Sequence, residues 1–326
     1  MNKQFAKWKA FFNPEHYQGW GKSKNYFEGW YFKLLNAACD QALAIIPGIS
    51  MDPEGKQEAF IQVLDGKLHS SNFYRFDGEV FKAKPGTFDI QIEGNRFSET
   101  EIILNLPEIK GTLQFENLVG WPKPWYSPGI MGPYAFVPFM ECYHGIVSMD
   151  HTISGQLIYH SKVLDFQNGR GYIEKDWGQS FPSSYVWMQS NHFSKPGISF
   201  KASVANIPWI RNSFVGFIAG LWYENQLIRF TTYNKTSLRK CKITLEQVEL
   251  ILENTNYLLE LNTQRNQATQ LAAPIQGVMD GRIEESMNSR IAVRLYSKKL
   301  RQVVFEDTGR YAALEVAGAI EEIQKY

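Results

Sequence analysis

The residues of this chain most able to do chemistry are carboxylates set among large aromatic rings. Glu28 lies within Tyr26–Lys33 (YFEGWYFK), and Asp176 lies within Glu174–Gly178 (EKDWG). A third segment, Trp187–Phe193 (WMQSNHF), supplies an imidazole. Acidic groups beside large rings are costly to bury ionised, so their pKa tends to rise and they can donate a proton near neutral pH. The three segments therefore predict acid–base chemistry.

A structural role is the alternative for each carboxylate. Glu28 or Asp176 could instead pair with a lysine such as Lys33 or Lys175, because structural ion pairs also perturb pKa values. Either carboxylate could also cap a backbone turn. The three cysteines are scattered, and the histidines show none of the helical spacings of a zinc site, so we expect no metal.

The elements that position these residues are predicted to be strands. Apolar and polar residues alternate with a period of two from end to end, most clearly in Phe88–Glu93 (FDIQIE). Turn dipeptides such as Asp65-Gly66 and Asp280-Gly281 separate the alternating runs. Many short strands at even spacing predict an all-β sandwich or barrel. One segment, Thr244–Leu261, fits either a strand or a helix by its pattern.

The chain also looks internally duplicated. Three segments recur in the same order in the second half: Ala59–Phe76 as Ser213–Phe230, Phe88–Phe97 as Val248–Tyr257, and Gly169-Arg170 as Gly309-Arg310. The second of these matches favours strands for Thr244–Leu261. The repeat predicts two antiparallel β-domains, residues 1–180 and 181–326, each closed into a barrel so that few strand edges are exposed.

Two segments differ from the predicted strands. The loop 119–145 holds five prolines among large rings, and long ordered loops are often functional. Its rings either cover a sheet or form a wall over an apolar ligand, and the sequence leaves both open. The start of the chain has Phe5, Trp8 and Phe11 on one helical stripe beside lysines. We expect a short helix packed on the β-structure, with peripheral membrane contact as the alternative.

Composition excludes several classes of function. The 34 Lys and Arg residues balance 33 Asp and Glu to a net charge of +1, without a basic stripe, so we expect no nucleic acid partner. Aromatic residues make up 14% of the 326 residues, which favours a ring-lined cavity. The start lacks the apolar run of a signal peptide, and the longest apolar stretch is too short to span a membrane. We expect a cytoplasmic location, with association with a membrane surface as the alternative.

Several stretches taken together resemble the tocopherol cyclase family. They are Tyr26–Lys33, Ser127–Gly132 (SPGIMG), Pro138–Gly145 (PFMECYHG), Glu174–Gly178 and Gln189–Phe193 (QSNHF). The likeness is good over residues 14–36 and 118–195 and looser towards the C-terminus. The last two stretches are the most specific.

The resemblance implies tandem lipocalin-like β-barrels, similar to those of carotenoid hydratases. It also implies a reaction without a cofactor that closes a chromanol ring on a prenylated hydroquinone. In such a reaction an acid protonates a trisubstituted alkene while the phenol loses its proton. By motif, Asp176 is the acid and Glu28 the second choice. Asn191 and His192 orient or deprotonate the phenol, and Tyr31 supports the acid by hydrogen bonding.

The substrate-binding positions that the resemblance implies are mostly aromatic. Ring faces stabilise the tertiary cation that develops on the protonated alkene, and an isoprenoid tail needs a deep apolar cavity such as a barrel encloses. The positions are Trp30, Trp177, Trp187, Gln189, Tyr134, Phe139, Glu141 and His144. We expect Glu28, Asp176 and His192 to line one pocket near the domain junction. The alternative is that they point into separate cores.

Two other functions remain open from the sequence. One is hydration of an isoprenoid alkene, and the other is non-catalytic carriage of an isoprenoid lipid. All three functions need an apolar cavity, but only an enzyme needs a carboxylic acid at the alkene.

Overall fold

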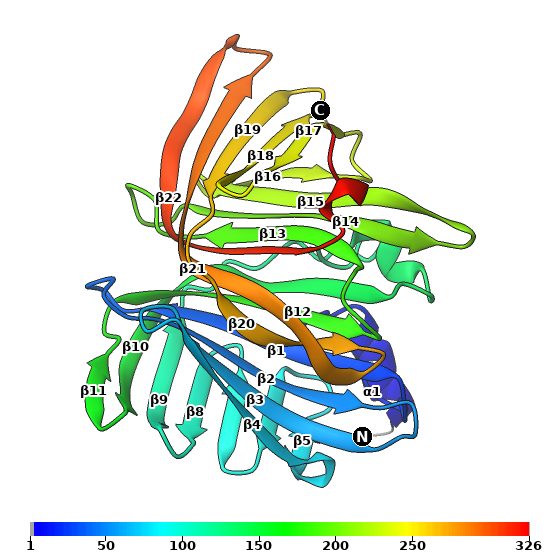
Figure 1. Cartoon of the computed structure of the whole chain (residues 1–326), viewed down its shortest axis with the longest axis vertical. Helices are drawn as coiled ribbons and strands as arrows, with labels where there is room; N and C mark the ends of the chain where they lie inside the picture. The colour runs from blue at the N-terminus through cyan, green and yellow to red at the C-terminus, as the bar shows by residue number, and fades with distance from the viewer. Residues whose placement is uncertain (1–2, 326) are drawn as a thin grey trace. The chain divides into compact units, whose positions relative to one another are not determined.

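The chain folds into two antiparallel β-units (Figure 1). The structure is a computed structural model that describes residues 3–325. The first unit runs to Phe181 and also includes Leu271–Arg282, while the second comprises Pro182–Gln270 and the chain from Ile283. The all-β prediction with two antiparallel sheets is confirmed. The segment Leu271–Arg282 groups with the first unit, which a simple division after residue 180 does not anticipate.

The first sheet has 12 strands among the described residues. They are β1 (Tyr26–Leu35), β2 (Ala42–Met51), β3 (Gln57–Asp65), β4 (Ser70–Asp77), β5 (Phe81–Ala83), β6 (Asp89–Ile92), β7 (Asn95–Ser98), β8 (Glu101–Asn105), β9 (Ile109–Glu116), β10 (Cys142–Tyr159), β11 (Lys162–Asp165) and β12 (Gly169–Gly178). Their order is β4-β3-β2-β1-β12-β10-β9-β8-β7-β6-β5, with β11 beside β10. The 3-10 helix η1 (Gly78–Val80) alone joins the end strands β4 and β5, so the sheet curls far enough to bring its two ends close together at this connection, as in a lipocalin-like barrel.

The second sheet has 10 strands within the described part of the chain. They are β13 (Ser184–Ser190), β14 (Ser199–Trp209), β15 (Asn212–Tyr223), β16 (Gln226–Thr231), β17 (Ser237–Ile243), β18 (Gln247–Glu253), β19 (Tyr257–Gln264), β20 (Thr269–Ile275), β21 (Val278–Ser297) and β22 (Gln302–Gly318). The order is β16-β15-β14-β13-β22-β21-β19-β18-β17, with β20 beside β21. The doubtful segment Thr244–Leu261 is therefore strand.

The first repeated segment of the sequence occupies matching places in the two sheets. Ala59–Phe76 covers β3 and β4, and Ser213–Phe230 covers β15 and β16. The second repeat falls on the hairpins β6–β7 and β18–β19, but β8 and β9 stand between β7 and β10, whereas β19 pairs directly with β21. In each sheet the first strand pairs with both the second and the last, β1 with β2 and β12, and β13 with β14 and β22. This shared arrangement around the first strand agrees with an internal duplication, although the second sheet has two strands fewer along its path.

Each unit has its own apolar core, built by strand alternation. Trp30, Phe32 and Leu34 on β1 point into the first core, and Val186 and Met188 on β13 point into the second. Within residues 3–325 the only α-helix is α1 (Lys3–Phe11), and the loop before β10 holds the 3-10 helix η2 (Gly132–Phe136), with η3 (Ile320–Glu322) near the C-terminus. No described helix is long and apolar enough to cross a membrane.

The hairpin formed by β20 and the start of β21 adds an arm, Leu271–Arg282, to the first unit. The backbone N–H of Gly277 donates to the carbonyl of Gln179 at 2.7 Å, and the N–H of Ala272 donates to the Gln62 side chain at 2.8 Å. Gly277 has φ +81°, and a Cβ there would lie 2.2 Å from the Met51 carbonyl oxygen. Only glycine fits this approach.

Candidate functional site

The outer face of β12 carries the polar residues of the candidate site. Successive residues of a strand point to opposite sides. Lys175 and Trp177 point towards the first core, where Trp177 packs on the core cluster. Tyr172, Glu174 and Asp176 therefore share the opposite face. The neighbouring strand β10 places His144 directly opposite Asp176.

His144 joins the two carboxylates of this face. Its Nδ1 lies 2.7 Å from Asp176 Oδ1, which is a short hydrogen bond. Its Nε2 is buried and makes no hydrogen bond among the described residues, and Glu174 Oε2 lies 3.4 Å from it. The Tyr172 hydroxyl donates a hydrogen bond to Glu174. The result is a chain of four groups in which one imidazole can pass a proton between its two nitrogens.

The same residues could in principle hold a metal ion. His144, Glu174 and Asp176 offer one ligand atom each within 4.8 Å of one another. The sequence expectation of no metal rested on helical spacing, whereas strand pairing assembles this set. The contact of 2.7 Å between His144 and Asp176 is shorter than the roughly 3.4 Å that separates ligand atoms around a tetrahedral metal. The observed geometry therefore fits proton transfer better than coordination.

Burial raises the pKa values of the ionisable groups around the cluster. Burial, reinforced by the neighbouring Glu174, raises the pKa of the Tyr172 hydroxyl well above its ordinary value. Burial also raises the pKa of the Cys142 thiol, whose Sγ lies 3.9 Å from Asp176 Oδ1. Glu141, at the end of the preceding loop, has its carboxyl pKa raised by burial. The phenol and the thiol thus add no negative charge beside the carboxylates.

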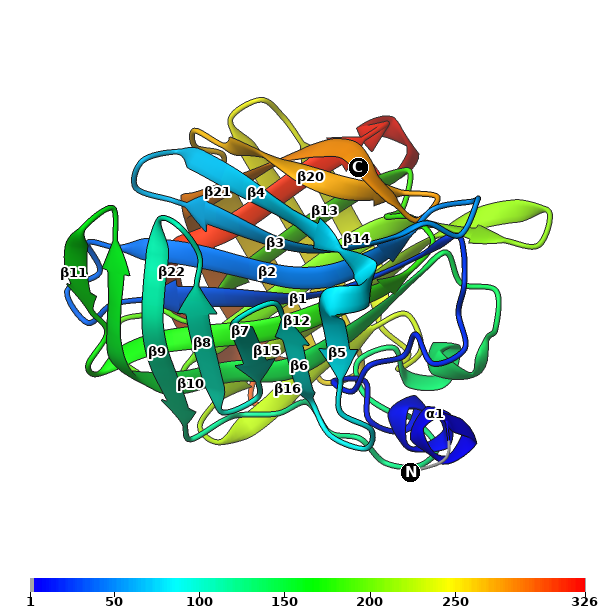
Figure 2. The same ribbon diagram turned by 90° about the horizontal axis from the view of Figure 1, so that it is seen from below.

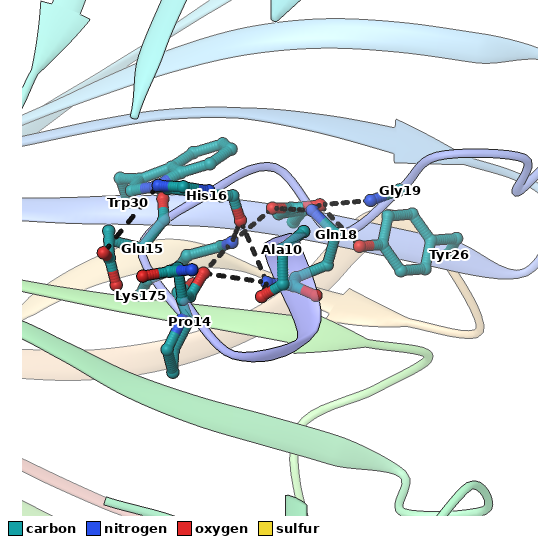
Figure 3. A network of polar contacts seen from close by, with 11 residues as sticks. Ala10, Pro14, Glu15, His16, Gln18, Gly19, Tyr26, Trp30 and Lys175 are labelled. Carbon is teal, nitrogen blue, oxygen red and sulfur yellow. Dashed lines mark hydrogen bonds and ion pairs between the residues drawn. The ribbon is translucent and has the colours of Figure 1, made fainter. Parts of the chain in front are cut away.

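Glu28 lies on the core face of β1, opposite Trp177, rather than in this cluster. Figure 3 shows the groups that surround it, among them Tyr26, Gln18 and Lys175. Its carboxylate is fully buried and lies 2.5 Å from Lys175 Nζ. It accepts hydrogen bonds from the backbone N–H groups of Gln18 and Gly19 and from the Tyr26 hydroxyl. Both structural alternatives for this residue, lysine pairing and capping of a turn, are therefore observed together.

Lys175 binds the segment that precedes β1. Its Nζ donates to the carbonyl oxygen of Pro14 at 2.9 Å and to that of His16. The ammonium lies 4.7 Å from the ring of Trp30 and 4.8 Å from that of Trp177. Burial lowers the pKa of Lys175, against the opposing effect of Glu28. The faces of Trp30 and Trp177, expected at a substrate cation, hold the protein's own cation here.

On the face that carries Asp176, the neighbouring strands β1 and β2 contribute two glycines, which lie under an aromatic ring. Gly29 pairs with Asp176 across β1, and Tyr31 pairs with Glu174, so Tyr31 stands next to Glu174 rather than next to the expected acid. Gly48 on β2 is covered by the ring of Phe60, whose Cζ would lie 2.3 Å from a Cβ at that position. The same ring atom would lie 3.7 Å from a Cβ at Gly29, so Phe60 covers both glycines on the face that carries the carboxylate.

The remaining predicted residues lie elsewhere. In the second unit, Trp187 and Gln189 are buried on β13, on the face opposite Val186 and Met188. His192 Nδ1 lies 2.9 Å from Asn191 Oδ1. The expectation that Glu28 and Asp176 line one pocket is wrong, because the two carboxylates lie on opposite faces of the first sheet. A pocket shared by Asp176 and His192 concerns both units and stays a prediction.

Two predicted residues belong to the loop of the first unit that precedes β10. Tyr134 is on η2, and Phe139 follows that helix. The Phe139 side chain is exposed. Whether this loop forms a wall over a ligand stays a prediction.

Sequence reasoning missed two members of the cluster. Glu174 and Tyr172 were not assigned a role, and His144 was expected only to bind substrate. The signal was present, because a period of two places residues 172, 174 and 176 on one face. The pairing of His144 with Asp176 depends on the register of β10 against β12, which contains bulges that no pattern in the sequence reveals.

The sequence is similar to one protein family and to plant proteins that carry the name of that family. A family model described as tocopherol cyclase-like matches residues 96–318. A chloroplastic tocopherol cyclase of Zea mays is 27% identical over 200 residues, which cover 57% of this chain and 41% of that protein. A probable chloroplastic tocopherol cyclase of Oryza sativa subsp. japonica is 25% identical over 372 residues, covering 93% and 77%. The match therefore spans less than half the length of the maize relative.

Two solved structures share the fold. CghA superposes with a TM-score of 0.56 at 11% identity, covering 90% of this chain and 88% of that chain. A putative AttH from Nitrosomonas europaea gives 0.53 at 13% identity, covering 90% and 92%. At such low identities these likenesses concern the fold alone.

Proposed function

Because the chain belongs to the tocopherol cyclase-like family, we propose that it cyclises a prenylated hydroquinone to a chromanol by proton transfer. The observation that carries the proposal is the short hydrogen bond between His144 and Asp176 on the EKDWG strand. The matched family region, residues 96–318, includes both residues. A carrier protein would need the apolar surface but not this pairing.

The reaction is an isomerisation, so substrate and product have the same atoms. The carboxyl of Asp176 donates a proton to the alkene carbon, and a tertiary cation forms on the neighbouring carbon. The phenolic oxygen bonds to that cation and releases its own proton. One proton enters the substrate and one leaves it. No oxidant, reductant or cofactor is required for this balance.

His144 returns the released proton to the acid. In the tautomer that we assign, Nδ1–H donates to Asp176 Oδ1 and the buried Nε2 is free to accept the phenolic proton. As Nε2 gains a proton, Nδ1 passes its own to Asp176, which restores the carboxylic acid and leaves His144 protonated on Nε2. Loss of that proton from Nε2 and return of one to Nδ1 must precede the next turnover. Glu174, 3.4 Å from Nε2, stabilises the transient imidazolium.

The roles of the other residues follow from their places. Tyr31 and Phe60 supply ring surface on the face of the cluster, and ring faces stabilise a developing carbocation. Glu28 acts through Lys175 and the segment around Gln18, so it is a structural residue in this proposal. Asn191 and His192, assigned to the phenol by motif, remain candidates for orienting the substrate.

The test is cyclisation in deuterated buffer. Purified protein is incubated with a hydroquinone that carries a prenyl chain, and the product is analysed by chromatography and mass spectrometry. We expect a chromanol with one deuterium at the former alkene carbon. Asp176→Asn should lower turnover about 10²–10⁴-fold, the usual contribution of general acid–base catalysis. Binding of the substrate should be retained.

The control variant is Asp280→Asn. Its carboxylate is 73% exposed, and its contact with Arg75 is long, at 4.0 Å. The substitution should therefore leave turnover unchanged. A product heavier by one water would instead favour a hydratase. Bound but unchanged substrate would favour a carrier. Turnover abolished by a chelator and restored by a divalent metal would contradict the proton relay.

A further inference from the structure

The N-terminal helix turns its large apolar side chains away from the protein. Ala6 and Ala10 are each 1% exposed and form the buried face of α1, whereas Trp8 is 62% and Phe5 45% exposed. A surface helix ordinarily buries its large apolar residues and exposes the polar ones. The helix α1 does the reverse. Its outer face is therefore suited to contact with an apolar environment.

The exposed rings form a continuous surface, here called the aromatic ridge. It consists of the exposed rings of Phe5, Trp8, Phe11 and Phe136 together with the half-buried ring of Phe12, which directly follows α1. Ring centroids are 6.2 Å apart for Phe5 and Trp8, and 5.7 Å apart for Trp8 and Phe12. Phe136 on η2 is 47% exposed and lies 5.3 Å from Phe11. Two separate elements thus supply the ridge, and Figure 2 shows α1 at the edge of the first unit, clear of the strands.

Positive charge borders the aromatic ridge. Lys7 is exposed, and the ammonium of Lys9 lies 5.4 Å from the centroid of the Phe5 ring. The first acidic residue of the chain is Glu15. Its side chain is buried and bound to Lys123 at 2.6 Å, so it does not offset the lysines. The ridge therefore combines an apolar centre with a cationic border.

We propose that the aromatic ridge docks the protein on an anionic lipid surface. Aromatic side chains partition into the boundary between headgroups and acyl chains, and lysine ammonium groups bind the headgroup phosphates. A second copy of the chain is a poorer partner, because a symmetric contact would set the lysine border against itself. Docking needs neither substrate nor turnover, so it is independent of the proposed reaction.

The test is co-sedimentation of the full chain with vesicles of phosphatidylcholine and phosphatidylglycerol in equal parts, without substrate. We expect binding at low salt that weakens as salt screens the lysines. Trp8→Ser should weaken partition about tenfold, the value of burying one large ring. Lys7→Gln with Lys9→Gln should weaken it about fivefold for each charge removed. Vesicles of phosphatidylcholine alone should bind less and show no lysine effect.

Matched controls separate the ridge from general surface effects. Leu245→Ser removes an apolar side chain that is 85% exposed, and Lys195→Gln with Lys299→Gln removes two exposed charges. These variants should bind like the parent. Brominated acyl chains should quench a fluorescence component of the parent protein that Trp8→Phe lacks. Absence of binding at low salt, equal binding by Trp8→Ser, or a dimer without lipid that Trp8→Ser dissociates would each overturn the proposal.

Discussion

Neighbouring residues of β12 have different roles, because successive side chains of a strand point to opposite faces of the sheet. Lys175 is fully buried and holds Glu28 together with two backbone carbonyls. Glu174 and Asp176, on either side of it, point outward to His144. Removing one member of a buried ion pair usually costs about 3–5 kcal/mol, because the other charge is left unpaired. The contacts of Lys175 therefore help to hold β12 in place, the strand that carries Asp176.

A buried histidine makes the stability of the first unit sensitive to acid. His151 is almost fully buried against Phe115, and burial lowers its pKa to about 3. In the unfolded chain its pKa is about 6.5. As the pH falls from about 6.5 towards 3, only the unfolded state takes up the proton, so the free energy of unfolding should fall by about 1.4 kcal/mol per pH unit across that window. Urea unfolding at several pH values measures this slope.

The variant His151→Gln should flatten the acid slope, because glutamine does not titrate. His160→Gln is the matched control, since His160 is exposed and its loss should leave the slope unchanged. Equal slopes for all three proteins would mean that His151 takes up its proton in the folded state.

At the residue scale, the sequence pointed to candidate residues but not to their partners. Asp176 was singled out by its motif, and its role as the acid stays a prediction. Its contact with His144 depends on the register between β10 and β12, which the sequence does not reveal. Glu28 was indistinguishable from Asp176 by local composition, since both stand among rings. The structure shows that their burial differs, and burial depends on which face of a strand points to the core.

At the element scale, the arm depends on one glycine. Gly277 combines φ +81° with a close approach to the Met51 carbonyl oxygen and the Tyr26 nitrogen. Gly277→Ala should destabilise the protein through backbone strain and through displacement of the arm. Gly197 has the same φ of +81° with nothing within 4 Å, so Gly197→Ala should cost only the strain, about 1–2 kcal/mol.

The difference between the two variants isolates the contact made by the arm. We expect Gly277→Ala to cost about 1–3 kcal/mol more than Gly197→Ala, the usual price of overpacking. Chemical denaturation of both variants gives the two free energies. Equal losses would mean that the arm adjusts freely to a methyl group.

The strands themselves were largely predictable. Alternation and turn dipeptides located most of them, and the internal repeat resolved Thr244–Leu261 as strand, where the pattern alone allowed a helix. The arm was not predictable, because β20 alternates like any other strand and its partners, such as Gln62, lie far away in sequence. Register and long-range contact leave little trace in local composition.

At the scale of the whole molecule, ligand binding should be visible as added stability. A prenylated hydroquinone at 100 times its Kd should raise the free energy of unfolding by about 2.7 kcal/mol. It should also quench the fluorescence of the nine tryptophans saturably, whereas a nucleotide should do neither. Thermal unfolding and fluorescence titration measure the two effects. No response to any isoprenoid would contradict both the cyclase and the carrier.

The position of the arm in the sequence also determines when the first unit can finish folding during synthesis. Residues up to Phe181 emerge from the ribosome first, but the first unit lacks Leu271–Arg282 until residues 182–270 have been translated. Domains generally fold as units during synthesis, the N-terminal one first. Here the first unit is completed only by the arm, Leu271–Arg282, which is translated after residues 182–270 of the second unit. The carbonyl of Gln179 and the side chain of Gln62 must remain without their partners from the arm throughout that interval.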